Sequence, residues 1–303
     1  MTGQKSLALD PHLTSSKAWA ETARVLREAG VESPVIDARL LVCHVLGIDR
    51  LGLLRDPYRP LGDARDALAA TVARRLAREP VSRIIGERAF WGRRFQISPA
   101  TLDPRADSET LVAAALEVAG PLRAGRNGVP LRVLDLGTGT GCLLLTLLSE
   151  IPEAVGTGVD ISAEALTVAE TNATNLDLSG RANFVRGNWG RGLDGTFDLI
   201  VSNPPYIRHD ELAGLPPEVI KYDPLRALDG GEDGLDAYRQ ILEVLPELSA
   251  NGAILFEVGL GQAETVQAML LSALGPGTFT SSARIAHRWR DLSNVERVVG
   301  ATT

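Results

Sequence analysis

The sequence is poor in cysteine and lacks long apolar runs. It contains only two cysteines, Cys43 and Cys142, which lie far apart in apolar surroundings. Two cysteines are too few for a disulfide framework or a thiolate metal site. We therefore expect both cysteines to be small core residues, and we expect no metal. No stretch approaches the roughly eighteen uninterrupted apolar residues of a membrane span, and the first residues lack the pattern of a signal peptide. We therefore expect a cytoplasmic protein that does not engage a membrane.

Positive charge is also in short supply over most of the chain. The formal net charge is −7, which disfavours a general nucleic-acid binder. Residues 1–100 nevertheless hold 16 Lys and Arg against 11 Asp and Glu, a net +5, so the remainder carries −12. The basic first part could face an anionic partner or could be an arginine-rich helical surface. The acidic remainder argues against nucleic acid as the direct substrate.

Helical patterns fill the first third of the chain. Ser33 and Pro34 supply an N-cap and a first-turn proline, and Gly47 stands where a C-terminal glycine belongs. Apolar residues also repeat at helical spacing over 19–26 and over 64–76. These helices with short connections predict a small N-terminal bundle domain over residues 1–86.

The periodicity changes after residue 86. Two short β-like runs parted by Gly92 predict a hairpin within a linker over residues 87–104. Short apolar segments then alternate with helix-length stretches through a second domain, residues 105–303. The predicted strands are 131–136, 155–160, 183–186, 197–202 and 253–258. This alternation indicates an α/β fold with a doubly wound, mostly parallel sheet.

A glycine-rich loop follows the first predicted strand and precedes an apolar helix. It consists of Gly137, Thr138, Gly139, Thr140 and Gly141. Glycines let the backbone turn sharply and approach a ligand, and the helix start offers free N–H groups. Asp160 ends the next strand, where a carboxylate can accept the hydroxyls of a ribose. A nucleotide-like cofactor is favoured, while an NAD enzyme and a purely structural turn remain alternatives at this point.

The strand over 197–202 leads into Asn203-Pro204-Pro205-Tyr206 at the carboxyl end of the sheet. An amide NH₂ is a poor nucleophile, because its lone pair is delocalised into the carbonyl group. The Asn203 side-chain oxygen and the Pro204 carbonyl can accept its two hydrogens, while the Tyr206 ring covers the planar group. This pattern predicts methyl transfer from S-adenosylmethionine to an amide or exocyclic amine, with Asn203, Pro204 and Tyr206 as the catalytic residues.

With both motifs placed, the sequence resembles the HemK/PrmC family of release factor N5-glutamine methyltransferases. The resemblance covers nearly the whole chain. It is carried by Arg78-Glu79-Pro80, Pro104-Arg105 with Glu109, the glycine loop, Asn203 to Tyr206, Tyr222-Asp223-Pro224, Gly230-Gly231 and Asp233-Gly234-Leu235. It implies a class I S-adenosylmethionine-dependent methyltransferase domain with a final antiparallel strand near residues 294–299. It also implies an N-terminal helical domain that helps hold the release factor.

The resemblance further implies a substrate and a set of ligand contacts. The substrate would be the glutamine of the Gly-Gly-Gln motif in bacterial peptide-chain release factors, and the second product S-adenosylhomocysteine. The glycine loop would contact the methionine portion of the cofactor, Asp160 its ribose, and Trp189 its adenine. Trp189 as a core residue is the competing interpretation.

The Asn203 to Tyr206 segment would serve substrate and cofactor together. Asn203 would touch both the cofactor and the target glutamine, and Pro204, Pro205 and Tyr206 would complete the substrate side.

The chain departs from the family pattern at two places. It reads Ala106-Asp107-Ser108 where the family usually has Pro-Glu-Thr, which loses a rigid proline and shortens one carboxylate. Asn188 stands where aspartate is common, and its amide oxygen could still accept from the adenine amino group without carrying charge. The contacts of both segments are therefore open from the sequence.

Three other functions fit part of the pattern. A glutamine methyltransferase of a large-subunit ribosomal protein would use the same chemistry with a different docking surface. A DNA adenine-N6 methyltransferase makes the same demands on the Asn203 motif, but it also needs a surface that grips and flips a base. A non-catalytic cofactor-binding adaptor would keep the glycine loop and have no reason to keep Asn203.

Overall fold

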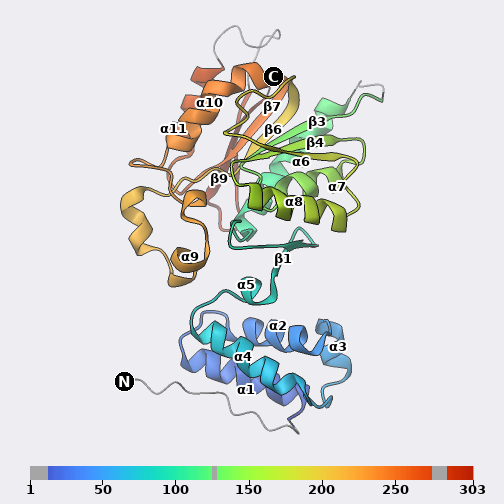
Figure 1. Ribbon diagram of the computed structural model, residues 1–303. Coiled ribbons are helices and arrows are strands. Elements are labelled where there is room, and N and C mark those ends of the chain that lie inside the picture. The colour runs from blue at the N-terminus through green and yellow to red at the C-terminus, as the bar shows by residue number, and fades with distance from the viewer. Residues whose placement is uncertain (1–12, 125–127, 275–284, 303) are drawn as a thin grey trace. The chain divides into compact units, whose positions relative to one another are not determined.

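The computed structural model describes residues 13–124, 128–274 and 285–302 (Figure 1). The chain forms two compact units. Unit 1 comprises the residues through Gly86 together with Pro217–Tyr222, and unit 2 comprises Glu87–Pro216 and the residues from Asp223 onward.

Unit 1 is helical. Its helices are α1 (Ser15–Glu28), α2 (Pro34–Leu46), α3 (Arg50–Arg55), α4 (Ala64–Leu76), α5 (Val81–Ile85) and α9 (Pro217–Tyr222). The predicted ends of α2 are confirmed: Pro34 starts the helix, and Gly47 closes it in the left-handed region at φ 62°. Leu26, Leu41 and Leu68 from three different helices are fully buried in its core.

Helix α9 belongs to unit 1 although it comes from far along the chain. Arg75 on α4 is buried, and its Nε lies 2.7 Å from Asp37 Oδ2. Its Nη1 lies 3.3 Å from Glu218 Oε1 on α9. At the end of α9, the Tyr222 hydroxyl donates to the Ala77 carbonyl at 3.4 Å. The buried guanidinium is thus shared by two carboxylates, one of which α9 supplies.

Unit 2 is built on a seven-stranded sheet with the order β5-β4-β3-β6-β7-β9-β8. Its strands are β3 (Arg132–Leu136), β4 (Val155–Asp160), β5 (Ala182–Arg186), β6 (Phe197–Ser202), β7 (Ser249–Glu257), β8 (Ile285–Arg290) and β9 (Glu296–Thr302). The first five are parallel, and β9 pairs antiparallel with both β7 and β8. The predicted fold class and final antiparallel strand are confirmed, whereas β8 was not predicted.

Helices cover both faces of this sheet (Figure 1). They are α6 (Glu109–Arg123), α7 (Cys142–Glu150), α8 (Ala163–Asn175), α10 (Asp236–Leu248) and α11 (Ala263–Ala273). Alternate residues of β3 enter two different cores: Val133 packs with α6 and α7, while Leu134 and Leu136 pack with α10 and α11. Because both faces are buried, the strands read as nearly continuous apolar runs, and that pattern made them recognisable in the sequence. Among the described residues, no helix is long and apolar enough to cross a membrane.

The predicted hairpin forms and belongs to unit 2. Strand β1 (Glu87–Phe90) pairs antiparallel with β2 (Arg93–Gln96). Trp91 and Gly92 at the turn both have positive φ, 48° and 73°, which suits a two-residue hairpin loop. Asn172 on α8 fixes the hairpin, because its side chain accepts from Gln96 N at 2.7 Å and donates to Gln96 O at 3.0 Å. The same side chain donates to the Thr140 carbonyl at 2.9 Å, so the hairpin is tied to the glycine loop.

Candidate active site

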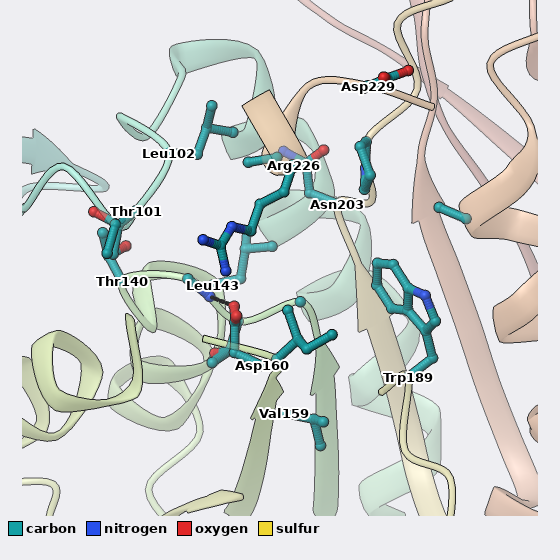
Figure 2. A pocket seen from close by; sticks show the side chains of 18 of the residues that line it. Thr101, Leu102, Thr140, Leu143, Val159, Asp160, Trp189, Asn203, Arg226 and Asp229 are labelled. Carbon is teal, nitrogen blue, oxygen red and sulfur yellow. Dashed lines mark hydrogen bonds between the residues drawn. The ribbon is translucent and has the colours of Figure 1, made fainter. Parts of the chain in front are cut away.

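A cavity of about 720 Å³ lies in unit 2 where the parallel strands end (Figure 2). Its lining includes the glycine loop after β3, the end of β4, the residues after β5 and the residues after β6. Ligands of open α/β sheets bind at this edge, and the volume falls within the roughly 300–1,000 Å³ typical of small-molecule sites. The structure therefore brings both sequence motifs to one cavity.

The glycine loop is shaped for close approach to a ligand. Gly137, Gly139 and Gly141 all have positive φ, at 76°, 54° and 76°. A Cβ on Gly137 would also lie 3.2 Å from Cζ3 of the Trp189 indole. Alanine at Gly137 would therefore be strained and would press on a cavity-lining aromatic ring. Gly137, Thr138, Gly139 and Thr140 line the cavity, whereas Gly141 packs behind it against Ala169.

A buried carboxyl group supports the loop from below. Thr138 Oγ1 donates to Asp135 Oδ2 at 2.7 Å, and Asp135 is fully buried at the end of β3. Burial raises the pKa of Asp135 to about 7, since desolvation disfavours its charged form. Asp135 is thus a structural partner of the loop that the sequence did not single out.

Asp160 has a second task besides the predicted contact with a ribose. Its Oδ2 accepts from Gly139 N at 2.9 Å, and its Oδ1 accepts from Ser162 N at 2.9 Å. A carboxylate offers about four lone-pair sites, so acceptor capacity remains on the side that lines the cavity. Asp160 can therefore hold the glycine loop and accept from a ligand diol at once.

Trp189 and Asn188 both line the cavity, next to Gly187. Trp189 has φ 52°, an uncommon value for a bulky residue, and this backbone turn presents its indole beside Gly137. Figure 2 shows the indole on the opposite side of the cavity from Asp160. Trp189 also packs against the core that α10 covers, so it lies between the cavity and the interior, and its contact with a ligand stays a prediction.

Asn203 stands at the end of β6, which is buried along its whole length. The preceding Ser202 fixes the strand end, because its hydroxyl donates to the Leu136 carbonyl at 2.6 Å. The Asn203 side-chain nitrogen donates to Ser108 Oγ at 3.1 Å. With the nitrogen engaged there, the side-chain oxygen is left for the cavity that Asn203 lines (Figure 2).

The rest of the motif divides between the cavity and the interior. Pro205 lines the cavity, while Pro204 is buried and neither it nor Tyr206 is among the lining residues. The Tyr206 hydroxyl donates to Glu257 Oε1 at 3.4 Å, and burial raises the pKa of that hydroxyl above its ordinary value. The hydroxyl of Tyr206 is therefore directed to a buried carboxyl group.

Two glycines of the Gly-Gly and Asp-Gly-Leu segments let the chain pack against Tyr206. A Cβ on Gly230 would lie 2.8 Å from Tyr206 Cα, and one on Gly234 would lie 2.5 Å from the Tyr206 carbonyl oxygen. The Gln262 side chain donates to that same carbonyl at 3.0 Å. Resemblance alone brought these glycines to attention, and the structure supplies the reason for them.

Three features of the site were missed or left open by the sequence. Arg226 lines the cavity, and Figure 2 shows its guanidinium extending toward Asp160. No periodicity or spacing marks this residue beforehand. In the segment that departs from the family pattern, Arg105 pairs with the buried Asp223 at 2.5 Å, and Asp107 pairs with Arg297 at 3.0 Å. That segment is thus anchored by two ion pairs despite the lost proline.

Comparisons with known families and proteins agree with this geometry. Residues 17–86 match the family described as the PrmC N-terminal domain, and residues 124–219 match the methyltransferase small domain. A release factor glutamine methyltransferase of Rhodospirillum rubrum is 49% identical over 247 residues, covering 81% of this chain and 74% of the relative. The protein of the same name from Caulobacter vibrioides is 41% identical over 290 residues, covering 95% and 96%.

Similarity to solved structures supports the fold alone. The catalytic domain of hMettl16, crystallised in complex with the MAT2A 3′UTR hairpin 6, superposes with a TM-score of 0.52 at 14% identity. The match covers 69% of this chain and 74% of that one. At this sequence identity the comparison supports the sheet architecture and gives no information about the substrate.

Proposed function

The chain belongs to the family of release factor glutamine methyltransferases, and on this premise we propose that it methylates a glutamine side chain of peptide-chain release factors. The acceptor is N5 of the glutamine in the Gly-Gly-Gln motif, and the donor is S-adenosylmethionine. The observation that carries the proposal is the Asn203 amide, whose oxygen is left for a cavity shared with the glycine loop and Asp160.

The cavity residues fit S-adenosylmethionine. The close-approach backbone at Gly137 and Gly139 suits the methionine portion, and the remaining acceptor capacity of Asp160 suits the ribose hydroxyls. Trp189 offers an aromatic face and Asn188 an amide oxygen for the adenine. When bound, this donor supplies an electrophilic methyl group on a sulfonium.

The residues of the Asn203 motif act by alignment. The Asn203 side-chain oxygen and the Pro204 carbonyl accept the two hydrogens of the target amide, which turns its nitrogen lone pair away from the plane. The rigid Pro204-Pro205 pair fixes the direction of the carbonyl, and the Tyr206 ring covers the planar group. None of these residues is assigned as a general base, and the proton of the methylated amide would leave to water.

The relatives favour this substrate over the alternatives. Relatives that align over most of this chain carry the name release factor glutamine methyltransferase. Residues 101–303 carry a net charge of −12, obtained from the −7 of the whole chain and the +5 of residues 1–100, which disfavours duplex DNA. We further propose that the protein works in the cytoplasm, where its release factor substrate is made and used, with no nucleic acid as direct substrate.

The test incubates the protein with radiolabelled S-adenosylmethionine and a release factor. One sample carries the intact Gly-Gly-Gln motif, and the other has its glutamine replaced by alanine. We expect label only on the intact factor. Label on both forms, or on duplex DNA instead, would contradict the proposed function.

A further inference from the structure

Charged side chains line the cavity of unit 2, and all but one of them have partners within the protein. They are Arg105, Asp160, Arg226, Asp229 and Asp236. Arg105 pairs with Asp223, and Asp160 accepts from two backbone N–H groups. Asp229 Oδ2 lies 2.9 Å from His209 Nδ1, and Asp236 Oδ1 lies 2.8 Å from Arg239 Nη1. Arg226 forms no hydrogen bond or ion pair with any part of the chain that the structure describes.

The backbone at Arg226 is held in place on both sides. Three residues earlier, the buried Asp223 forms its ion pair with Arg105 at 2.5 Å. Two residues later, the Leu228 carbonyl accepts from Ile207 N at 3.0 Å, and Ile207 directly follows the catalytic segment. The long side chain of Arg226 therefore starts from a fixed point beside that segment, while its guanidinium has no partner to hold it.

The Arg226 side chain extends into the cavity, with its guanidinium directed toward Asp160 (Figure 2). The remaining acceptor capacity of Asp160 is assigned to the ribose of S-adenosylmethionine, and Asn203 to the amide that receives the methyl group. The methyl group must reach Asn203 while the ribose meets Asp160. The sulfur, and the amino-acid portion that it carries, therefore enter the space between these two residues. Arg226 points into that same space.

The charges of the donor match those of the lining. S-adenosylmethionine carries a cationic sulfonium, a cationic ammonium and one anionic group, the carboxylate of its amino-acid portion. Asp160, Asp229 and Asp236 give the cavity an acidic lining, which suits the two cations and repels the carboxylate. A guanidinium can bind a carboxylate through two parallel N–H···O bonds. The unpaired cation of the cavity thus fits the only anion of the ligand.

We propose that Arg226 binds the carboxylate of the amino-acid portion of S-adenosylmethionine. This inference rests on the proposed function, because it takes that compound as the methyl donor. The contact distinguishes the donor from nucleosides that carry a ribose and an adenine without an amino-acid portion. The product S-adenosylhomocysteine has the same carboxylate, so the contact persists through methyl transfer. Arg226 therefore determines the affinity of the cavity and leaves the methyl-transfer step itself to the Asn203 motif.

The test compares ligands with and without the carboxylate. Decarboxylated S-adenosylmethionine keeps the sulfonium and the ammonium and lacks only that group. In isothermal titration calorimetry, we expect the unmodified protein to bind it about tenfold more weakly than S-adenosylmethionine. Arg226→Gln should bind S-adenosylmethionine about tenfold more weakly, whereas its Kd for the decarboxylated compound should stay within about twofold. Tenfold is the lower end for hydrogen bonds to a charged group, because Arg226 is exposed and water screens it.

Two further ligands and a control variant make the comparison specific. S-adenosylhomocysteine keeps the carboxylate, so it should show the same loss in Arg226→Gln. 5′-Methylthioadenosine keeps the ribose and lacks the amino-acid portion, so its Kd should not change. A loss shared by this nucleoside would mean that Arg226 serves Asp160 and the ribose instead, which overturns the proposal. Arg290→Gln is the matched control, because that exposed arginine on β8 pairs with Glu296 at 3.1 Å and does not line the cavity.

Steady-state methyl transfer to a release factor gives a second readout. A contact made equally in the ground state and the transition state contributes to KM and not to kcat. We therefore expect the KM for S-adenosylmethionine to rise about tenfold in Arg226→Gln, with kcat within about twofold. Arg226→Lys keeps the charge but loses the paired donors, so its KM should rise less.

The outcomes of these experiments are distinct. Absence of label on the intact release factor with the unmodified protein contradicts the proposed function, whereas calorimetry reads the Arg226 contact without any methyl acceptor. Equal Kd values of the unmodified protein for S-adenosylmethionine and its decarboxylated form, or an equal loss for both in Arg226→Gln, overturn the inference about Arg226 alone. Thermal melts identify any loss of folding. If Arg226→Gln does not fold, the same ligand comparison with the unmodified protein and Arg226→Lys decides the question.

Discussion

Substitution of Asp160 by asparagine separates its two tasks in the cavity. Its carboxylate accepts from Gly139 N and Ser162 N at 2.9 Å each, and its remaining lone pairs are assigned to a ribose. An asparagine keeps one acceptor oxygen and presents NH₂ in place of the other. One backbone N–H then faces a donor, and one ribose hydroxyl loses its acceptor.

The magnitude follows from the bonds that are lost. A hydrogen bond to a charged acceptor contributes about 1.5–3 kcal/mol. Loss of one ribose bond should therefore weaken S-adenosylmethionine binding by about 10- to 150-fold. Loss of the backbone bond should lower the free energy of unfolding by about 1.5–3 kcal/mol in the absence of ligand, because that bond also has a charged acceptor.

Two assays read these effects independently. Isothermal titration calorimetry gives the Kd for S-adenosylmethionine, and urea unfolding without ligand gives the stability. Glu170→Gln on the exposed side of α8 is the control, and it should change neither. Weaker binding with unchanged stability would refute the role in holding the loop, and lower stability with unchanged binding would refute the ribose contact.

Three further predictions concern the Asn203 motif and the buried carboxyl groups. Asn203→Ala should lower single-turnover methyl transfer by about two orders of magnitude or more while changing S-adenosylmethionine affinity only modestly, and unchanged turnover would rule out its role. Tyr206→Phe keeps the ring and loses only the long 3.4 Å bond to Glu257, so kcat should fall less than about tenfold, whereas Tyr206→Ala should lose far more; equal losses would contradict a covering role for the ring. Asp135 has its pKa raised from 3.8 to about 7, so the folded state binds its proton more tightly and stability should decline as the pH rises from 3.8 to about 7. Chemical denaturation across this range should show a shallower decline for Asp135→Asn, and an identical slope would contradict the burial effect.

The sequence predicted those parts of the fold that depend on residues close together in the chain. Strands β4 and β6 lie where alternating apolar segments placed them, at Val155–Asp160 and Phe197–Ser202. Helix α2 begins and ends at its predicted proline and glycine. Periodicity and caps depend on neighbouring residues, and therefore one sequence suffices to recognise them. β8 was missed because its residues alternate in exposure at the edge of the sheet, without a buried run.

The site was only partly predictable for the same reason. The predicted site residues stand at or directly after the ends of predicted strands, so the sequence alone points to them. They are Gly137 to Gly141, Asp160 and Asn203. The Asn203 bond to Ser108 and the Tyr206 bond to Glu257 each join distant segments, and nothing in their spacing marks them. Arg226 reaches the cavity from the short helix η3 (Leu225–Ala227), and the residues that follow this helix form backbone hydrogen bonds with Ile207. Contacts of this kind arise from the tertiary structure, which periodicity does not encode.

The position of α9 has a consequence for the order in which the chain folds. The ion pair between Arg75 and Glu218 joins residues 143 positions apart. Adding α9 to unit 1 therefore has the entropy cost of closing a long loop. During synthesis from the N-terminus, the first five helices emerge well before α9, and β6 with the Asn203 segment is made in between. The helical unit thus receives its last helix only after β6 and the Asn203 segment have been synthesised. A fragment that ends at Gly86 would lack α9, so Arg75 would pair with Asp37 alone.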